Sequence, residues 1–277
     1  MPEVTALKVG KQLDVPQPKH APFVKLPRNE CMITVSGGGK TNAHIQTLTQ
    51  PWGLAGLFDK YIVMSPNAFT DPNYKVLADY IEKTTGQKKE DCFFTEWDPQ
   101  VLLDTMKEMR KVNAYVRKNK KALGATRLYS CHITIDDWAD RSEVSKSPNS
   151  PLIKLWTQGR HSQCSCTCLT QKFRLLHSAI RINNNSLWIG RVTSSLEAKA
   201  LAEEFGAAAG SEKNFLQMLK RATDPDFGFL YIVFGLKIRF FNSYRSEFQI
   251  TDKLNGPGDT TRREHGESRV GEAVESD

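Results

Sequence analysis

The run CMITVSGGGKTNAHIQTL (31–48) constrains the fold most strongly, because it joins an apolar stretch to a helical one through three consecutive glycines. A phosphate-binding loop needs a strand that delivers the chain, small residues that expose backbone N–H groups, and a helix directly behind them. We expect the strand at 31–35 and the helix at 40–48, with the sequence PWG at 51–53 ending the helix. The run therefore predicts a binding site for phosphate groups.

The predicted nucleotide-binding residues lie in the glycine loop and at the start of the helix. They are Ser36, Gly37, Gly38, Gly39, Lys40, Thr41 and Asn42. In the pattern G-x-x-x-x-G-K-[ST] (Walker A), the lysine reaches the β- and γ-phosphates and the hydroxyl binds Mg²⁺, which are the roles we assign to Lys40 and Thr41. Thr34 stands where the pattern has its first glycine, and a β-branched residue resists a positive φ. A glycine-rich turn that precedes Lys-Thr by coincidence is the alternative.

The stretch HITIDD (132–137) is an apolar strand that ends in two acids, as a Walker B motif does. Such a strand end places one carboxylate beside the Mg²⁺ shell and the next beside the attacking water. We assign Asp136 to the metal, through a bridging water, and Asp137 to the general base that orients or deprotonates the nucleophilic water. A solvated acidic turn is the alternative. The glycine loop upstream favours an NTPase.

Gln171 follows the apolar-leaning strand SCTCLT (165–170). If this strand is the sheet neighbour of the acidic strand, its end lies beside the γ-phosphate. A carboxamide there can donate a hydrogen bond to phosphate and accept one from water, so it can sense hydrolysis. An ordinary polar strand end explains the residue equally well.

Strand-like and helix-like segments alternate along the chain, which predicts an α/β three-layer domain with a mostly parallel sheet. We expect a Pro-rich extended arm at 1–29, the P-loop domain at 30–250 and a disordered tail at 251–277. Further helices are expected at 71–85, 99–120, 150–158, 195–205 and 211–222, a polar loop at 139–150, and further strands at 61–64, 92–94, 127–135, 165–170, 185–189 and 229–241.

The composition is compatible with an intracellular protein that binds a polyanion. The formal net charge is +7 with a pI near 9.0, which fits nucleic acid but also many other partners. No secretory leader is visible, so we expect the six cysteines to be reduced thiols. Cys164, Cys166 and Cys168 alternate along a strand, which favours burial over zinc binding. The longest apolar run, FGFLYIVFGL (227–236), is too short to span a membrane and predicts a buried strand.

The order of these motifs resembles that of the genome-packaging ATPases of large double-stranded DNA viruses, which belong to the FtsK–HerA class. The resemblance extends from about residue 30 to about residue 245, and such a domain also occurs in Polintons. The stretches that carry it are SGGGKTN (36–42), YIVMSPNAFTDPNYK (61–75), ITIDDWAD (133–140), LWTQGRHSQCSCTCLTQKF (155–173), AIRINNNSLWI (179–189) and FLYIVFGLKIRFFNSY (229–244).

The resemblance implies a RecA-like ASCE fold and an oligomeric ring that hydrolyses ATP with Mg²⁺ to drive double-stranded DNA into a preformed capsid. Capsid or portal proteins would be its partners, and the virion or the viral assembly site its location. Lys40 and Thr41 match the family's loop pair, Asp136 and Asp137 its acidic pair, and Gln171 its sensor. Thr34 departs from the family's glycine, which puts the rate of turnover in doubt more than nucleotide binding.

A ring motor also needs a cation from the neighbouring subunit to neutralise charge in the transition state. Arg160, in the GRH segment, and Arg181 are the candidates for this arginine finger, with Arg160 slightly preferred. A surface arginine paired with an acid explains either residue equally well.

Two other functions remain open at this point. A nucleotide-binding scaffold or relic could keep the same fold without hydrolysis, and Thr34 motivates that hypothesis. A small nucleotide or metabolite kinase would explain the loop and the basic charge. It would not explain the acidic pair together with GRH and Gln171.

Overall fold

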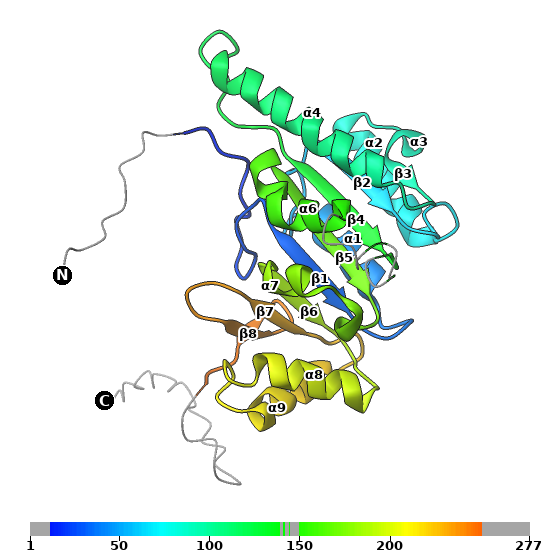
Figure 1. The fold of residues 1–277 in the computed structure, drawn as a ribbon, viewed down its shortest axis with the longest axis vertical. Coiled ribbons are helices and arrows are strands. Elements are labelled where there is room, and N and C mark those ends of the chain that lie inside the picture. The colour runs from blue at the N-terminus through cyan, green and yellow to red at the C-terminus, as the bar shows by residue number, and fades with distance from the viewer. Residues whose placement is uncertain (1–11, 139–140, 142–143, 145–149, 251–277) are drawn as a thin grey trace, which may run out of the picture.

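The computed structural model describes residues 12–138, 141, 144 and 150–250 of the chain. Within these residues a nine-stranded sheet has the order β3-β2-β4-β5-β1-β6-β7-β8-β9 (Figure 1). Its strands are β1 (Asn29–Ile33), β2 (Lys60–Met64), β3 (Phe93–Phe94), β4 (Cys131–Asp136), β5 (Cys164–Thr170), β6 (Ser186–Ile189), β7 (Leu230–Val233), β8 (Arg239–Asn242) and β9 (Ser246–Glu247).

The six strands β3, β2, β4, β5, β1 and β6, in their order across the sheet, pair in parallel. Strands β7, β8 and β9 extend the sheet beyond β6 with antiparallel pairs. Strand β5 lies between β1, which leads into the glycine loop, and β4, which ends in the acidic pair. The predicted α/β architecture, a mostly parallel sheet with helices on both faces, is confirmed.

Helices connect the parallel strands, and several begin at positions that the sequence marks. Asp71, Asp98 and Ser150 cap the N-termini of α2, α4 and α6, each accepting a hydrogen bond from the backbone N–H two residues on and each followed by proline. The helices are α1 (Lys40–Thr49), α2 (Pro72–Thr85), α3 (Lys89–Cys92), α4 (Pro99–Lys118), α6 (Pro151–Gln158), α7 (Ser178–Ile182), α8 (Ser195–Phe205) and α9 (Glu212–Thr223), with 3₁₀ turns η1 (Gly159–Ser162) and η2 (Phe173–Leu175).

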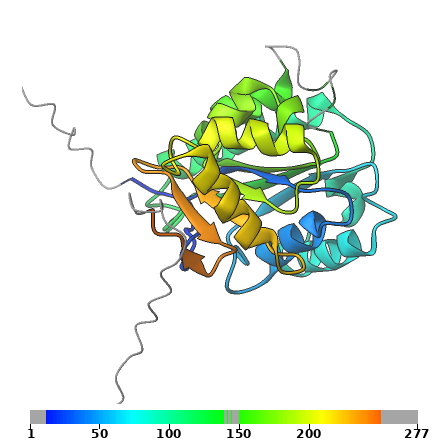
Figure 2. The same ribbon diagram turned by 90° about the horizontal axis from the view of Figure 1, so that it is seen from below.

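The helices cover both faces of the sheet (Figure 2). Helices α1 and α2 pack on one face, and α6, α7, α8, α9 and most of α4 pack on the other. Strand β2 shows why both faces are apolar: Tyr61 and Val63 point to the α1 side, whereas Ile62 and Met64 point to the α4 side. A strand buried on both faces reads as a continuous apolar run, as these strands do.

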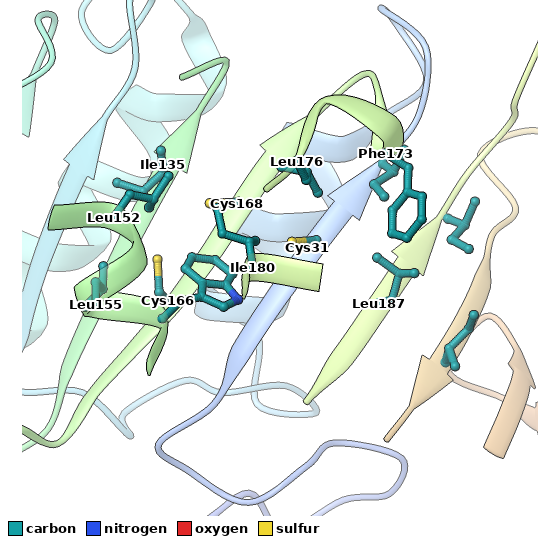
Figure 3. Packing of buried hydrophobic residues seen from close by; sticks show 14 of the residues in the cluster. Cys31, Ile135, Leu152, Leu155, Cys166, Cys168, Phe173, Leu176, Ile180 and Leu187 are labelled. Atoms are coloured by element: carbon teal, nitrogen blue, oxygen red, sulfur yellow. The ribbon is translucent and has the colours of Figure 1, made fainter. Parts of the chain in front are cut away.

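Cysteines line the core between the central strands and the larger helical layer. Cys166 and Cys168 on β5 lie beside Cys31 on β1, beneath Leu155 and Ile180 (Figure 3). Cys164, Cys166 and Cys168 belong to one cluster, which confirms that their alternation places them on one face. All six cysteines are buried, and none forms a disulfide bond in the described part of the chain.

The predicted strand at 229–241 is wrong, because the chain turns back within it. Strands β7 and β8 form an antiparallel hairpin in which Val233 pairs with Arg239. Phe227 and Leu236, at the ends of the longest apolar run, are exposed, so only the middle of that run is a buried strand. A continuous apolar run carries no sign of where a hairpin turns, and Gly235 is the local break.

Several smaller boundaries also differ from expectation. Cys92 ends the short helix α3 instead of starting a strand, and β4 begins at Cys131, four residues after the predicted start at 127. Residues 1–11, most of the predicted loop 139–150 and the predicted tail 251–277 lie outside the described residues. Among the helices that are described, none has the length and apolar character needed to cross a membrane.

Candidate nucleotide-binding site

The glycine loop has the backbone that a phosphate site needs. Gly37 and Gly39 have φ of 73° and 85°, in the left-handed region where glycine is favoured. Gly39 is the N-cap of α1, and its carbonyl accepts the N–H of Ala43 at 2.9 Å. The loop therefore ends at a helix N-terminus, where free backbone N–H groups and the helix dipole attract an anion.

Thr34 fits the loop without the conflict that its sequence position suggested. It is not among the described residues with positive φ, and it is 1% exposed. Its hydroxyl donates to the carbonyl oxygen of Arg191 at 3.1 Å, which ties the end of β1 to the chain that follows β6. A Cβ added at Gly38 or Gly190 would lie only 2.3 or 2.6 Å from the Thr34 hydroxyl, so these two glycines make room for the threonine.

Lys40 and Asp137 meet at the edge of the sheet. The Lys40 Nζ lies 3.6 Å from the Asp137 Oδ1, and their side chains are 11% and 33% exposed. Asp137 has φ of 56°, rare for a residue with a side chain, and its N–H donates to the Leu169 carbonyl at 3.1 Å. The residue thus leaves β4 in a conformation that sets its carboxylate beside the loop lysine.

The two carboxylate oxygens of Asp136 differ in their hydrogen bonds. Its Oδ2 accepts hydrogen bonds from the hydroxyls of Ser65 at 3.1 Å and Tyr74 at 2.7 Å. Its Oδ1 is buried and has no hydrogen-bond partner among the described residues. Burial, and then the charge of Asp137, raise the pKa of Asp136. A divalent cation at Oδ1 would offset both effects, so the residue fits a metal-binding role.

The end of β5 lies at the same edge of the sheet as Lys40 and the two acids. The Thr34 N–H donates to the Thr170 carbonyl at 3.4 Å, so the ends of β1 and β5 lie side by side. Gln171 follows β5 and lines a pocket of about 230 Å³ together with Thr34 and Arg191. Thr41 lies in the first turn of α1, directly after Lys40. Lys40, Asp136, Asp137 and Gln171 therefore come together at one edge of the sheet.

The two predicted arginine fingers precede strands, Arg160 before β5 and Arg181 before β6. Arg160 is in η1, just before β5, so the length of that strand, about 20 Å, separates it from the loop. Arg181 is in α7, before β6, where it forms an ion pair with Glu204 at 2.8 Å and stacks on Phe173 at 5.2 Å. Arg160 therefore lies far from the loop of its own chain, so a catalytic role for it requires a neighbouring copy, whereas Arg181 is paired with Glu204 of its own chain.

Sequence reasoning missed Arg191, Ser65 and Tyr74. Arg191 follows β6 beside the loop, lines two pockets there, and faces Asp226 at 4.0 Å. Ligands in open α/β sheets bind outside the carboxyl ends of the strands, so the end of β6 was the signal that could have identified it. Ser65 and Tyr74 lie in the stretch that contributed to the family resemblance, but their contact with Asp136 depends on the pairing of β2 with β4.

Known structures share this fold. The genome-packaging NTPase B204 of Sulfolobus turreted icosahedral virus 2, solved with sulfate, matches with a TM-score of 0.51 and 15% identity over 78% of this chain and 96% of B204. The chain has the fold of this viral packaging NTPase. The predicted resemblance to viral genome-packaging ATPases is thereby confirmed at the level of the fold.

Other comparisons are more distant. The pCW3 conjugation coupling protein TcpA, with ATPγS, gives a TM-score of 0.49 at 15% identity. That match covers 79% of this chain but 60% of the coupling protein, so the chain spans less than two thirds of its length. No protein family and no curated protein sequence matches the chain.

Proposed function

We propose that the chain binds ATP with Mg²⁺, hydrolyses it, and uses the energy to move double-stranded DNA. One observation carries the proposal: the Lys40 ammonium, the Asp137 carboxylate 3.6 Å away and the unpartnered Oδ1 of Asp136 lie together at a glycine loop. A cation, a base and a metal-binding oxygen at a helix N-terminus are the groups that phosphoryl transfer to water requires.

The Lys40–Asp137 ion pair suggests how the site responds to nucleotide. A triphosphate on the loop offers Lys40 a stronger anionic partner than one carboxylate. Lys40 then binds phosphate oxygens, and Asp137 is released to accept a hydrogen bond, and finally a proton, from the attacking water. Gln171, at the end of β5, would orient the same water or report loss of the γ-phosphate.

The residues present fit Mg²⁺. Thr41 would bind it directly and Asp136 through water, using the buried Oδ1 that lacks a partner among the described residues. Bound there, Mg²⁺ would neutralise charge on the β- and γ-phosphates. No group of three or more His, Cys, Asp or Glu side chains in the described part of the chain is arranged for a metal.

DNA translocation is the wider part of the proposal. B204 is named for genome packaging and shares this fold, and the net charge of +7 suits a polyanion. In a ring, Arg160 or Arg181 would contact the site of the next copy. Capsid or portal proteins would be partners, and the chain would act inside the cell, at a virion or assembly site.

An ATPase assay tests the catalytic core. We expect Mg²⁺-dependent phosphate release, stimulated by double-stranded DNA. Asp137→Asn should lower turnover by about 10²–10⁴-fold while ATP still binds, and Lys40→Ala should abolish binding and turnover together. Asp104→Asn, on the exposed face of α4, is the matched control and should leave the rate unchanged.

Three outcomes would contradict parts of the proposal. Robust turnover in Asp137→Asn would remove that residue from the role of base. Tight ATP binding without phosphate release in the unmodified chain would favour the non-hydrolysing scaffold. Transfer of phosphate to a small acceptor in place of water would favour a kinase.

A further inference from the structure

A large pocket lies beside the glycine loop and is not part of any motif that the sequence displays. Its volume is about 670 Å³. The N-terminal segment, helix α1 and the strands β7 and β8 with their connections form its walls; the segment and the hairpin lie side by side in Figures 1 and 2. Aromatic rings line it: Phe23, Trp52, Phe227, Phe229 and Tyr244.

Three of these rings form one wall that brings together distant parts of the chain. Phe23 stacks on Trp52 with 6.2 Å between ring centroids, and Tyr244 lies 4.8 Å from Phe23 and 5.9 Å from Trp52. The Tyr244 hydroxyl is 3.3 Å from the Thr47 hydroxyl on α1, which fixes the wall to the helix behind the loop. The wall is therefore a rigid aromatic surface in a concave site, which suits a flat ring.

Phe227 stands where this pocket meets the phosphate loop. Its ring packs on Gly39: a Cβ added to that glycine would lie 2.8 Å from the Phe227 Cδ1. Phe227 also lines a second pocket, of about 220 Å³, together with Ser36, Gly37 and Gly38. One side chain thus borders both the aromatic pocket and the loop.

The conformation of Phe227 is costly, and packing does not explain it. Its φ is 57° and its side chain is 72% exposed, although it is a large apolar residue. Ser243, which lines the same pocket, also has a positive φ, of 55°. Strained non-glycine residues concentrate at ligand sites, and Asp137 is a further example in this chain.

We propose that this pocket binds the base and ribose of the nucleotide, with Phe227 as the stacking surface for the base. The inference rests on the proposed nucleotide binding and deepens it. The loop and the first turn of α1 hold the phosphates, and Ala43 and Gln46, about one turn further along α1, line the pocket. The part of a nucleotide that follows its phosphates therefore lies in this pocket.

The chemistry of the pocket selects a purine nucleoside. Aromatic faces stack on any base, and the larger ring system of a purine offers them more area. Polar side chains at the rim, Gln46, Asn242 and Arg245, can bond the edge of the base or the ribose hydroxyls. The N-terminal segment contributes Phe23 and closes the site from outside the P-loop core.

The test compares a non-hydrolysable ATP analogue with inorganic tripolyphosphate, each titrated with Mg²⁺ into the full chain by calorimetry. We expect Phe227→Ala to weaken the analogue by about 10- to 100-fold and to leave tripolyphosphate unchanged. Phe227→Tyr should restore the affinity. Tyr115→Ala, an exposed aromatic on α4, is the matched control and should change neither ligand.

The outcomes separate this inference from the proposed function. Lys40→Ala should weaken both ligands, and if neither ligand binds the unmodified chain, phosphate binding itself fails. If Phe227→Ala weakens both ligands equally, the residue acts through the loop and the base pocket is wrong. If the variant changes neither, the base lies elsewhere. Because Phe227 is exposed, its removal should not unfold the chain, and a thermal melt verifies this.

Discussion

The parallel part of the sheet and its antiparallel extension place their functional side chains in different ways. On β1, β4 and β5 the polar groups lie at or after the end of a buried strand, so Lys40, Asp136 and Gln171 lie at one edge because parallel strands end there. Around β7 and β8 the aromatic pocket forms because a hairpin brings Phe227 and Tyr244 back to α1. The residues at the end of a strand can be identified from the sequence around them. The contact between a hairpin and a helix far away in the sequence cannot.

The two regions are held together by a buried polar network. Arg28, before β1, forms an ion pair with Glu30 at 3.1 Å, and its other guanidinium nitrogen donates to the Tyr231 hydroxyl on β7 at 3.1 Å. The Ser186 hydroxyl on β6 donates to Glu30 at 2.7 Å. The network therefore links the loop strand to the hairpin, so the phosphate site and the aromatic pocket keep a common geometry.

Removing Glu30 should have the largest effect on stability. Glu30→Ala leaves the Arg28 charge buried without its counterion, which costs about 3–5 kcal/mol of unfolding free energy. Urea denaturation measures the loss. Lys199→Ala breaks the exposed Lys199–Glu203 pair at 3.7 Å and is the matched control, expected to cost about 0.5 kcal/mol or less. Similar costs for the two variants would show that the network does not couple the two regions.

Replacing Thr34 with the glycine of the common pattern tests the loop strand alone. Thr34→Gly removes the hydroxyl bond to Arg191 and adds backbone freedom, so we expect about 1–3 kcal/mol of destabilisation and no faster hydrolysis. Denaturation and phosphate release are the two measurements. Thr34→Ser keeps the hydroxyl and should lose less stability. Faster turnover in Thr34→Gly at unchanged stability would mean that the threonine impairs the loop.

A pH dependence of stability should come from two buried histidines of the parallel part. Burial lowers the pKa of His44 to about 3, and burial and the neighbouring His44 lower the pKa of His132. At acidic pH the unfolded chain therefore binds protons at these two histidines that the folded chain does not bind. Stability is present above the unfolded pKa of about 6.5 and falls with decreasing pH by up to about 1.4 kcal/mol per unit for each histidine.

His132→Phe isolates this contribution. Neither ring nitrogen of His132 has a hydrogen-bond partner among the described residues, and its ring lies among Phe58, Tyr61 and His44. A phenylalanine should therefore fit and should reduce the loss of stability between about pH 7 and about pH 5 by about half. An unchanged pH slope would assign the acid sensitivity to other groups.

Much of the parallel part was predictable from single segments. The glycine loop, the strand before it and the acidic pair are local patterns, whereas the position of β5 between β1 and β4 comes from the structure. The hairpin was not predicted, because the run at 227–236 was interpreted as one buried strand and Gly235, where the chain turns, was not taken as a break. The motifs also did not show that Arg160 lies at the edge opposite the glycine loop, or that Arg181 forms an ion pair with Glu204.

The sequence by itself determined which side chains could serve a nucleotide, because Lys40, Asp136, Asp137 and Gln171 belong to patterns that local backbone rules produce. Only the tertiary structure decided how Thr34 is accommodated, since Gly38, Gly190 and the Arg191 carbonyl surround it from three segments. The structure alone also brought Phe23, Trp52, Phe227 and Tyr244 together. Contacts between distant segments depend on how the sheet is ordered and closed, and no local pattern encodes that order.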